Sequence, residues 1–205
     1  MARPLSDEVR TRVLTAAAQE FAASGYRGAT MAALARRAGV STGNIYRYFA
    51  DKDALFTAVL PDEFAARLLR LLQRRVSALV RADDLSALDD DAQARAEELL
   101  GFWIEHRLQV VTLLDRAHGS RHEGFCDQFV RELVRASKAK LRHGSRRRLP
   151  REVDFLLEQI FRNTVRSIVA ILENHPDERD IRRAFQGFWS YQLAGLAGFD
   201  KWVQS

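Results

Sequence analysis

The sequence predicts an all-α protein of about nine helices. Apolar residues recur at spacings of three and four along most of the chain, and no stretch alternates apolar and polar residues long enough to indicate a strand. The 205 residues include only four prolines and eleven glycines, as expected for helices joined by short connections. Because 47% of the residues are hydrophobic, the chain can bury a sizeable core in one or two domains.

The first part of the chain is predicted to form four helices, because a Ser, Thr or Asp suited to an N-cap stands before each one. From cap to stop residue they are Ser6 to Gly25, Thr30 to Gly39, Ser41 to about Phe49, and Asp51 to Pro61. Pro61 lacks a backbone donor and disfavours helical geometry at Leu60, so a kink is expected there. Beyond the kink an amphipathic helix continues to about Val80.

Five further helices are predicted in the rest of the chain. They span about 91–106, 107–117, 123–142, 151–174 and 177–200. Five aspartates indicate a solvated loop before the first of them. These are Asp83, Asp84, Asp89, Asp90 and Asp91.

Positive charge is concentrated at the start of the sequence. Residues 1–52 hold eight basic side chains and four acidic ones, so they carry +4 of the formal net charge of +5. A basic module joined to a nearly neutral one points to a polyanionic partner.

The cysteine count and the hydropathy pattern indicate a cytoplasmic protein. Cys126 is the only cysteine, so an intrachain disulfide is impossible and a reducing compartment is expected. The stretch from Met1 to Glu8 lacks the apolar core of a signal peptide. No run approaches the roughly 20 apolar residues that span a bilayer, so no membrane partner is expected.

Two short helices around Gly39, within the basic segment, indicate a helix-turn-helix. The second helix of such a unit enters the major groove with its first residues facing base edges. Here it begins with small polar residues that let the backbone approach DNA closely, namely Ser41, Thr42, Gly43 and Asn44. Apolar residues on its other side can pack on Leu34 and Phe21, and these are Val40, Ile45 and Phe49.

Possible donors to DNA follow directly in the sequence. Tyr46, Arg47 and Tyr48 offer hydroxyl and guanidinium groups to phosphates, and Arg47 could instead reach a guanine edge. Tyr46 could also be partly core. Lys52 stands at the start of the fourth helix, where amide donors and positive charge suit a phosphate.

The segment from Gly25 to Leu55, GYRGATMAALARRAGVSTGNIYRYFADKDAL, resembles the DNA-binding signature of the tetracycline-repressor (TetR) family of bacterial transcriptional regulators. The resemblance covers about the first 56 residues. It implies a helix-turn-helix domain at 1–52 and a helical effector-binding and dimerisation domain at 53–205. It also implies that seven residues contact DNA: Thr30, Ser41, Thr42, Gly43, Tyr46, Tyr48 (a position often held by histidine) and Lys52. The pattern of residue types described above adds Asn44 and Arg47 to these candidates.

Two apolar stripes near the end of the chain favour a homodimer, as the resemblance also implies, although core packing could explain either stripe alone. The small residues from Ala194 to Gly198 would allow close contact between helices. The predicted interface residues are Phe155, Phe161, Thr164, Ile168, Phe185, Phe188, Trp189, Gln192 and Leu196.

By the same resemblance, a small-molecule effector pocket lies among the fourth to eighth helices. Its candidate lining is largely apolar and aromatic and would suit a hydrophobic or planar ligand, although each residue could instead be ordinary core. The candidates are Phe64, Leu68, Phe102, Trp103, His106, Val110, Leu113, His118, Phe125 and Phe129.

Three weaker signals have plainer explanations. The stretch from Gly39 to Gly43 matches a Gly-x-Ser-x-Gly elbow, but that motif needs a preceding strand and helix is predicted here. Adjacent pairs among His118, His122 and Cys126 could share a metal on an unbroken helix, but Gly119 and Ser120 interrupt it and one metal cannot reach all three residues. The basic stretch could be a second anion site or a solvated loop. It contains Lys138, Lys140, Arg142, Arg146, Arg147, Arg148 and Arg151.

The sequence thus predicts a dimeric repressor that binds a palindromic operator and is released by a small-molecule effector, without a cofactor. One alternative is a helix-turn-helix protein with no effector. Another is an all-helical enzyme, which the lack of paired catalytic motifs and of a Gly-rich phosphate loop disfavours.

Overall fold

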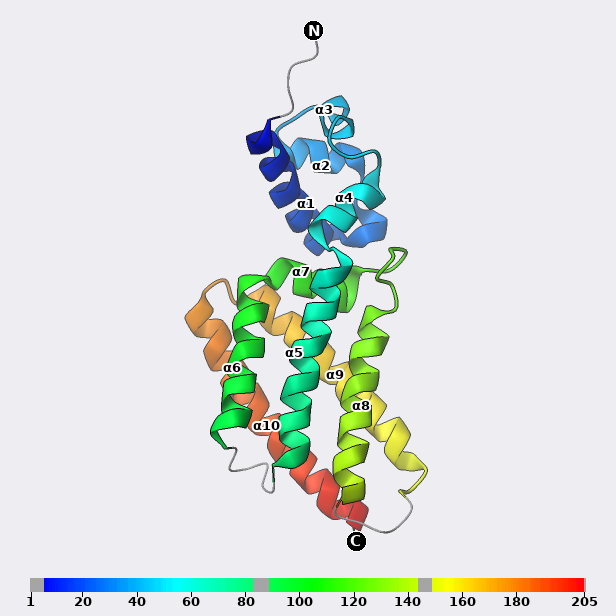
Figure 1. Cartoon of the computed structure of the whole chain (residues 1–205), viewed down its shortest axis with the longest axis vertical. Helices are drawn as coiled ribbons and strands as arrows, with labels where there is room; N and C mark the ends of the chain where they lie inside the picture. The colour runs from blue at the N-terminus through cyan, green and yellow to red at the C-terminus, as the bar shows by residue number, and fades with distance from the viewer. Residues whose placement is uncertain (1–5, 83–88, 144–148, 205) are drawn as a thin grey trace. The chain divides into compact units, whose positions relative to one another are not determined.

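The computed structural model describes residues 6–82, 89–143 and 149–204, and within these ranges every regular element is helical, as predicted. In chain order the elements (Figure 1) are α1 (Asp7–Gly28), α2 (Met31–Ala38), α3 (Thr42–Tyr46), α4 (Lys52–Val59), α5 (Asp62–Arg81), α6 (Asp90–Glu105), α7 (Arg107–Val111), the π-helical segment η1 (Thr112–Arg116), α8 (Phe125–His143), α9 (Glu152–Asn174) and α10 (Glu178–Gln204).

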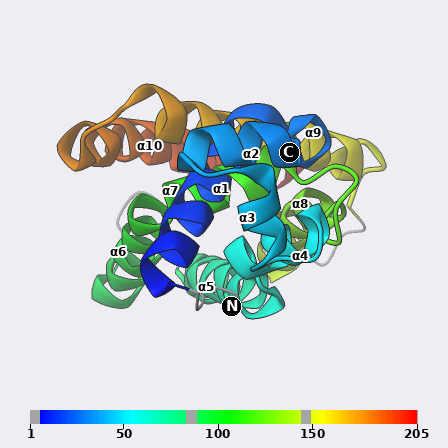
Figure 2. The ribbon, with the colours of Figure 1, turned by 90° about the horizontal axis from the view of Figure 1, so that it is seen from above.

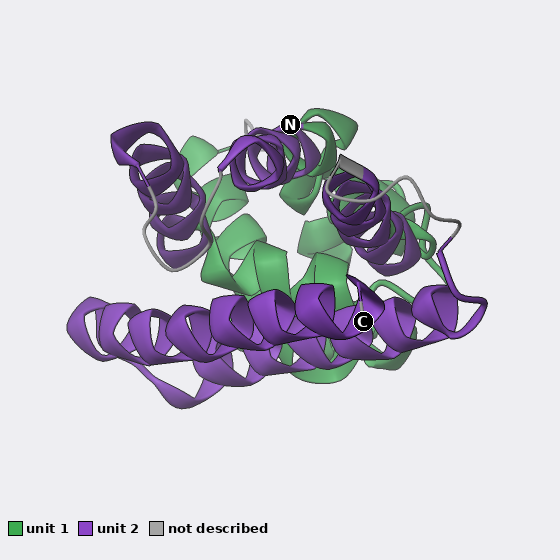
Figure 3. Ribbon diagram, turned by 90° about the horizontal axis from the view of Figure 1, so that it is seen from below, with its two compact units in different colours: residues 1–66, 106–125 green, residues 67–105, 126–205 purple. Residues whose placement is uncertain are grey.

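Two compact units make up the chain (Figure 3). Unit 1 comprises residues 1–66 and 106–125, and unit 2 comprises 67–105 and 126–205. The first boundary between the units, between Ala66 and Arg67, falls inside α5. These units are defined by packing, and the functional division at residue 52 stays a prediction.

Unit 1 is held together by aromatic and aliphatic side chains from its first four helices. Phe21 of α1 and Phe56 of α4 are fully buried and meet edge to face, with ring centroids 4.9 Å apart. Leu34, Ile45 and Phe49 are also buried, as predicted for the apolar side of the helix-turn-helix, whereas Val40 is half-exposed. Gly25 has a φ of 69° in the left-handed region, so the regular turns of α1 break there as predicted, although the helix resumes to Gly28.

Unit 2 contains the remainder of α5 together with α6, α8, α9 and α10. The last two are long helices that run side by side, and Figure 3 shows the other three nearly end-on beside this pair. Its core includes Leu68, Phe129, Leu157 and Phe185, all fully buried.

The predicted kink at Pro61 is confirmed. Helix α4 ends at Val59, Leu60 adopts φ −131° and ψ 73°, and α5 begins at Asp62. The carbonyl of Leu60 accepts a hydrogen bond from Nε2 of the buried His122 at 2.9 Å, so a side chain stabilises the broken junction.

Three local predictions need correction. Helix α3 ends at Tyr46, and the chain continues to Phe49 in a hydrogen-bonded turn on the carbonyl of Ile45. The helix expected over 107–117 is split into α7 and η1. Asp90 and Asp91 begin α6 and are not loop residues, while Asp83 and Asp84 lie outside the described residues.

Candidate nucleic-acid interface

The turn between α2 and α3 depends on Gly39. Its φ of 67° is a left-handed conformation that glycine adopts without a steric penalty, and its N–H donates to the carbonyls at the end of α2. Arg12 of α1 donates from Nη2 to the carbonyls of Ala38 and Gly39, at 2.9 and 3.2 Å. The C-terminal end of α2 is therefore fixed both by the turn and by α1. In Figure 2, α3 runs across the direction of α2, as a helix-turn-helix requires.

Side-chain caps begin three of the first four helices, as predicted. Oxygens of Thr30, Ser41 and Asp51 accept hydrogen bonds from the backbone N–H three residues later, at 3.1, 3.2 and 2.7 Å. Ser6 was expected to cap α1 in the same way, but its side chain makes no capping bond. Its N–H instead donates to the hydroxyl of Tyr48 at 2.9 Å.

A buried carboxylate braces α2 against α1. Glu20 is only 7% exposed and accepts hydrogen bonds from Arg37 Nε at 2.8 Å and Ser24 Oγ at 2.9 Å. Burial by itself raises the pKa of Glu20. The hydrogen bonds from Arg37 and Ser24, with the charges of Arg37 and Arg36, outweigh burial and hold this pKa below its ordinary value.

The start of α3 presents polar groups outward over a buried apolar side. Ile45 is fully buried and Phe49 nearly so. The exposed or half-exposed residues of this segment are Ser41, Thr42, Gly43, Asn44, Arg47 and Tyr48. Tyr46 is 52% exposed, so the expectation that it is partly core is wrong.

Gly43 has no packing reason to be glycine. A Cβ built at this position would meet no described atom within 4 Å, and its φ is not positive. Since glycine weakens a helix, packing within the described chain does not explain this glycine, and the same is true of Gly101 in α6.

Lys52 has an internal role that the sequence did not indicate. Its Nζ donates to the carbonyls of Tyr26 and Ala29 at 2.7 and 3.1 Å and lies 4.4 Å from the centroid of the Tyr26 ring. The ammonium group therefore holds the end of α1 against the start of α4. A phosphate contact by Lys52 stays a prediction. If Lys52 makes that contact, it does so in addition to its bonds with the two carbonyls.

Comparisons with known proteins identify the class of this chain. Residues 13–59 match the pattern of a family described as bacterial regulatory proteins, tetR family. The chain is 30% identical over 145 residues to the HTH-type transcriptional regulator BetI of Burkholderia ambifaria, a match that covers 66% of this chain and 75% of that protein. BetI of Burkholderia mallei is 31% identical over 137 residues, covering 62% and 70% respectively.

Solved structures agree in fold. A TetR-like transcriptional regulator from Rhodococcus sp. RHA1 superposes with a TM-score of 0.54 at 22% identity, covering 96% of this chain and all of that one. The ketosteroid transcriptional regulator KstR2 of Mycobacterium tuberculosis gives 0.55 at 20% identity, covering 93% and 96%. The chain belongs to the tetR family of bacterial transcriptional regulators, and its α2–turn–α3 unit is the helix-turn-helix of that family.

Part of the predicted dimer interface is corrected by the structure. Phe161, Ile168 and Phe185 are at most 3% exposed in the single chain, so they belong to its own core. Trp189 is half-buried, and its ring lies near Trp103 and Phe185 of the same chain at tilted angles of 51° and 41°. Phe155 is 63% exposed, and the other predicted residues are half-exposed on α9 and α10. These are Thr164, Phe188, Gln192 and Leu196.

The candidate effector residues are divided between the two compact units. Phe64, His106, Val110, Leu113, His118 and Phe125 belong to unit 1, whereas Leu68, Phe102, Trp103 and Phe129 belong to unit 2. Leu68, Val110 and Phe129 are fully buried, and His118 is exposed. Their role in ligand binding stays a prediction.

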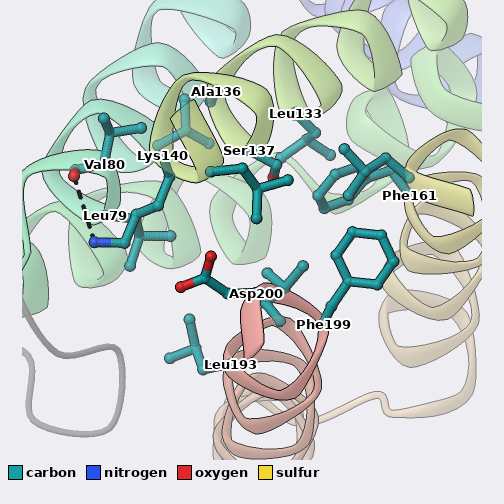
Figure 4. A pocket seen from close by; sticks show the side chains of 14 residues that line it. Leu79, Val80, Leu133, Ala136, Ser137, Lys140, Phe161, Leu193, Phe199 and Asp200 are labelled. Atoms are coloured by element: carbon teal, nitrogen blue, oxygen red, sulfur yellow. Dashed lines mark hydrogen bonds between the residues drawn. The ribbon is translucent and has the colours of Figure 1, made fainter. Parts of the chain in front are cut away.

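An apolar cavity lies elsewhere in unit 2, between α5, α8, α9 and α10 (Figure 4). Its empty volume is about 610 Å³, part of which is open to solvent. The lining is Val76, Leu79, Val80, Leu133, Ala136, Ser137, Lys140, Leu141, Leu157, Phe161, Leu193, Leu196, Phe199 and Asp200. Sequence reasoning missed this cavity because most of its lining residues are Leu, Val and Phe at helical spacing, which is also the pattern of an ordinary core.

The weaker signals have structural functions. Ser41 Oγ caps α3, and His122 supports Leu60. Lys138 pairs with Asp154, and Lys140 donates to carbonyls at the end of α5, while Arg146, Arg147 and Arg148 lie outside the described residues. No group of three or more His, Cys, Asp or Glu side chains within the described ranges could hold a metal ion. None of the described helices is long and apolar enough to cross a membrane.

Proposed function

We propose that the protein is a cytoplasmic, ligand-responsive repressor that binds a palindromic operator as a homodimer and is released by a small-molecule effector. The single observation that carries the DNA-binding part is the start of α3. It is capped by the Ser41 side chain, its outward residues are small and polar, and Gly43 leaves space that nothing in the described chain fills. A helix of this kind suits close approach to base edges in a major groove.

Within this proposal the DNA contacts divide into two kinds. Thr42 and Asn44 face base edges, since they stand at the exposed N-terminal end of the recognition helix. Thr30, Ser41, Tyr46, Tyr48 and Lys52 position the module on phosphates. Arg47 is exposed at the end of α3 and can reach either. Gly43 contributes by lacking a side chain.

The proposed dimer uses the outer side of α9 and α10. A groove along this pair is lined by Ile160, Asn163, Thr164, Ser167, Phe188, Tyr191, Gln192, Gly195, Leu196 and Phe199. Tyr191 is 77% exposed at this groove, an unusual position for a large aromatic side chain. At Gly195 and Gly198 an added Cβ would meet no described atom within 4 Å, so a helix of a second copy could approach closely.

The proposed effector site is the apolar cavity of unit 2. Its lining is mainly Leu, Val and Phe, and a hydrophobic effector fits such a lining. Asp200 points into the cavity in Figure 4 and accepts a hydrogen bond from Gln204 at 2.9 Å. Because α5 lines this cavity and also begins at the Pro61 kink, a ligand that shifts α5 can influence the junction with α4.

Recovery of genomic fragments bound by the purified protein tests the DNA-binding part. We expect an inverted repeat whose half-sites lie about one helical turn, or a multiple, apart. Affinity for that repeat should fall with salt by a log–log slope of several units, because each subunit neutralises a few phosphates. Equal affinity for every duplex would contradict specific recognition by this motif.

Tyr191→Glu tests the dimer separately. Since Tyr191 is exposed in the single chain, the variant should fold normally but become monomeric in light scattering and lose most of its operator affinity. Gln159→Glu, which adds the same charge at an exposed position of α9, is a control for surface charge. A Tyr191→Glu protein that remains dimeric would place the interface elsewhere.

A further inference from the structure

Arg75 is a buried cation for which residues 6–82, 89–143 and 149–204 provide no counter-ion. It lies on α5 and is only 6% exposed. Its Nη1 donates to the carbonyl of Ala92 at 2.7 Å, and no acidic side chain of the described chain forms an ion pair with it. Burial lowers the pKa of Arg75, as expected for a charge removed from water. One carbonyl satisfies a small part of a guanidinium that has five N–H donors.

A second buried donor lies in the same cluster. Trp103 of α6 is 2% exposed, and its Nε1–H has no hydrogen-bond partner among the described residues. Buried indole N–H groups usually find an acceptor. An unpaired donor and a buried cation that lacks a carboxylate partner together favour an acceptor carrying negative charge at this place.

Trp189 of α10 connects these two groups. Its ring centroid lies 5.8 Å from Arg75 Cζ and 6.3 Å from the Trp103 ring centroid. Phe185 completes the cluster, 5.2 Å from Trp103 and 5.6 Å from Trp189 between ring centroids. Trp189 is half-exposed, so the cluster reaches the surface of the chain at this side chain. We call Arg75, Trp103, Phe185 and Trp189 the arginine–aromatic cluster.

The cluster is adjacent to the apolar cavity along two helices. Residues four apart share one side of a helix, so Leu79 follows Arg75 on α5 and Leu193 follows Trp189 on α10. Leu79 and Leu193 both line the cavity and are visible in Figure 4. The charged cluster and the apolar cavity are therefore one helical turn apart on both helices.

We infer that the arginine–aromatic cluster binds the carboxylate of an effector whose apolar part occupies the cavity. The planar guanidinium of Arg75 matches the two oxygens of a carboxylate, and the Trp103 N–H can donate to the same group. A neutral ligand would leave the buried charge uncompensated. This inference rests on the proposed function, because it names the chemical class of the effector: an amphipathic carboxylic acid.

Thermal unfolding of the full chain without DNA tests the inference. The probes are octanoate and phenylbutyrate, each compared with its primary amide. At about a hundredfold excess over Kd, a ligand that binds only the folded state should raise the Tm by roughly 5–10 °C. We expect this rise for the two acids and not for the amides, together with a change in tryptophan fluorescence.

Arg75→Met retains the length of the side chain but removes its charge. It should weaken binding of the acids at least tenfold while leaving the ligand-free Tm equal to or above that of the wild type, because an uncompensated buried charge is lost. Trp103→Phe, which retains a ring but removes the N–H, should weaken binding less. Arg74→Met is the matched control, since Arg74 is the preceding residue on α5, is exposed and pairs with Glu98.

Two outcomes would overturn the inference. In one, neither acid shifts the wild-type Tm and Arg75→Met lowers the ligand-free Tm, which would give Arg75 a purely structural function at Ala92. In the other, Arg75→Met binds the acids as well as Arg74→Met does. Operator release is measured separately. A neutral compound that releases DNA equally from Arg75→Met and Arg74→Met would contradict carboxylate binding at Arg75 but would leave the proposed repressor function intact.

Discussion

Replacing Gly43 by alanine should stabilise the free protein and weaken its binding to DNA. The added methyl group meets no described atom within 4 Å, and the backbone of Gly43 does not need a positive φ. Alanine also reduces the conformational freedom of the unfolded chain. The expected gain in unfolding free energy is about 0.5–1 kcal/mol, which raises the Tm by roughly 1–4 °C for a chain of this size.

The effect on DNA has the opposite sign. If the backbone of α3 approaches DNA at Gly43, a methyl group in each subunit separates the two surfaces. We expect operator affinity to fall at least tenfold, which corresponds to about 1.4 kcal/mol. The measurements are thermal unfolding by circular dichroism without DNA, and fluorescence anisotropy with the operator recovered from genomic fragments.

Gly101→Ala is the matched control. Gly101 lies within α6, and a Cβ there would also meet no described atom within 4 Å. This variant should gain a similar stability and retain full operator affinity. Unchanged affinity in Gly43→Ala would refute the close approach to DNA, and a lower Tm would refute the reasoning about free space.

Three further predictions concern Glu20, Lys52 and Pro61. The pKa of Glu20 is held below its ordinary value, so the ionised carboxylate stabilises the fold above about pH 4.5, and this stabilisation is lost as the pH falls through the folded-state pKa. Glu20→Gln should therefore be less stable than the wild type at neutral pH and should lose less stability on acidification. Urea unfolding at several pH values measures both effects. Lys52→Ala should lower the unfolding free energy by roughly 1–3 kcal/mol, because two carbonyls lose a charged donor, and should weaken all DNA sequences about equally; unchanged stability would contradict the contacts with Tyr26 and Ala29. Pro61→Ala should change the effector concentration needed for operator release more than it changes DNA affinity without effector, and identical release curves would rule out a hinge at this residue.

The DNA-binding unit was predictable because its determinants are local. Caps at Thr30, Ser41 and Asp51 act on residues three positions away, and Gly39 ends α2 by its own backbone conformation. Such features leave a pattern in a short stretch of sequence. The spacing of Leu34 and Ile45 likewise follows from helical periodicity.

The contacts that fix this unit in three dimensions were not predictable from the sequence. Arg12 meets Gly39 and Lys52 meets Tyr26 across more than 20 positions, and long basic side chains give no periodic signal. The bond from Ser24 to Glu20 spans four positions on one helix and could have been found, whereas that from Arg37 could not. Lys52 shows the consequence: its residue type suggested a phosphate contact, and only the fold revealed two carbonyls beside it.

The effector region was least predictable for a similar reason. A stripe of Leu, Val and Phe looks the same whether it fills a core or lines a cavity, because both need apolar residues at helical spacing. The difference arises from how well four helices pack together, which depends on residues far apart in the sequence. The prediction that Phe161, Ile168 and Phe185 lie at a dimer interface was wrong for the same reason. Helical periodicity identifies an apolar side, but it does not show whether that side packs in the protein's own core or against a second copy.

Gly43 and Arg75 nevertheless share a property that indicates function. Each is unfavourable for the isolated chain: Gly43 weakens a helix, and Arg75 buries a charge beside a single carbonyl acceptor. In both cases we propose that the missing interaction comes from outside the chain, by close contact with DNA at Gly43 and by a carboxylate at Arg75. Residues that break local rules without a compensating contact are expected at functional sites. Higher stability combined with weaker binding in Gly43→Ala and in Arg75→Met is therefore a stronger test than loss of binding alone, because a residue needed for folding would lose both.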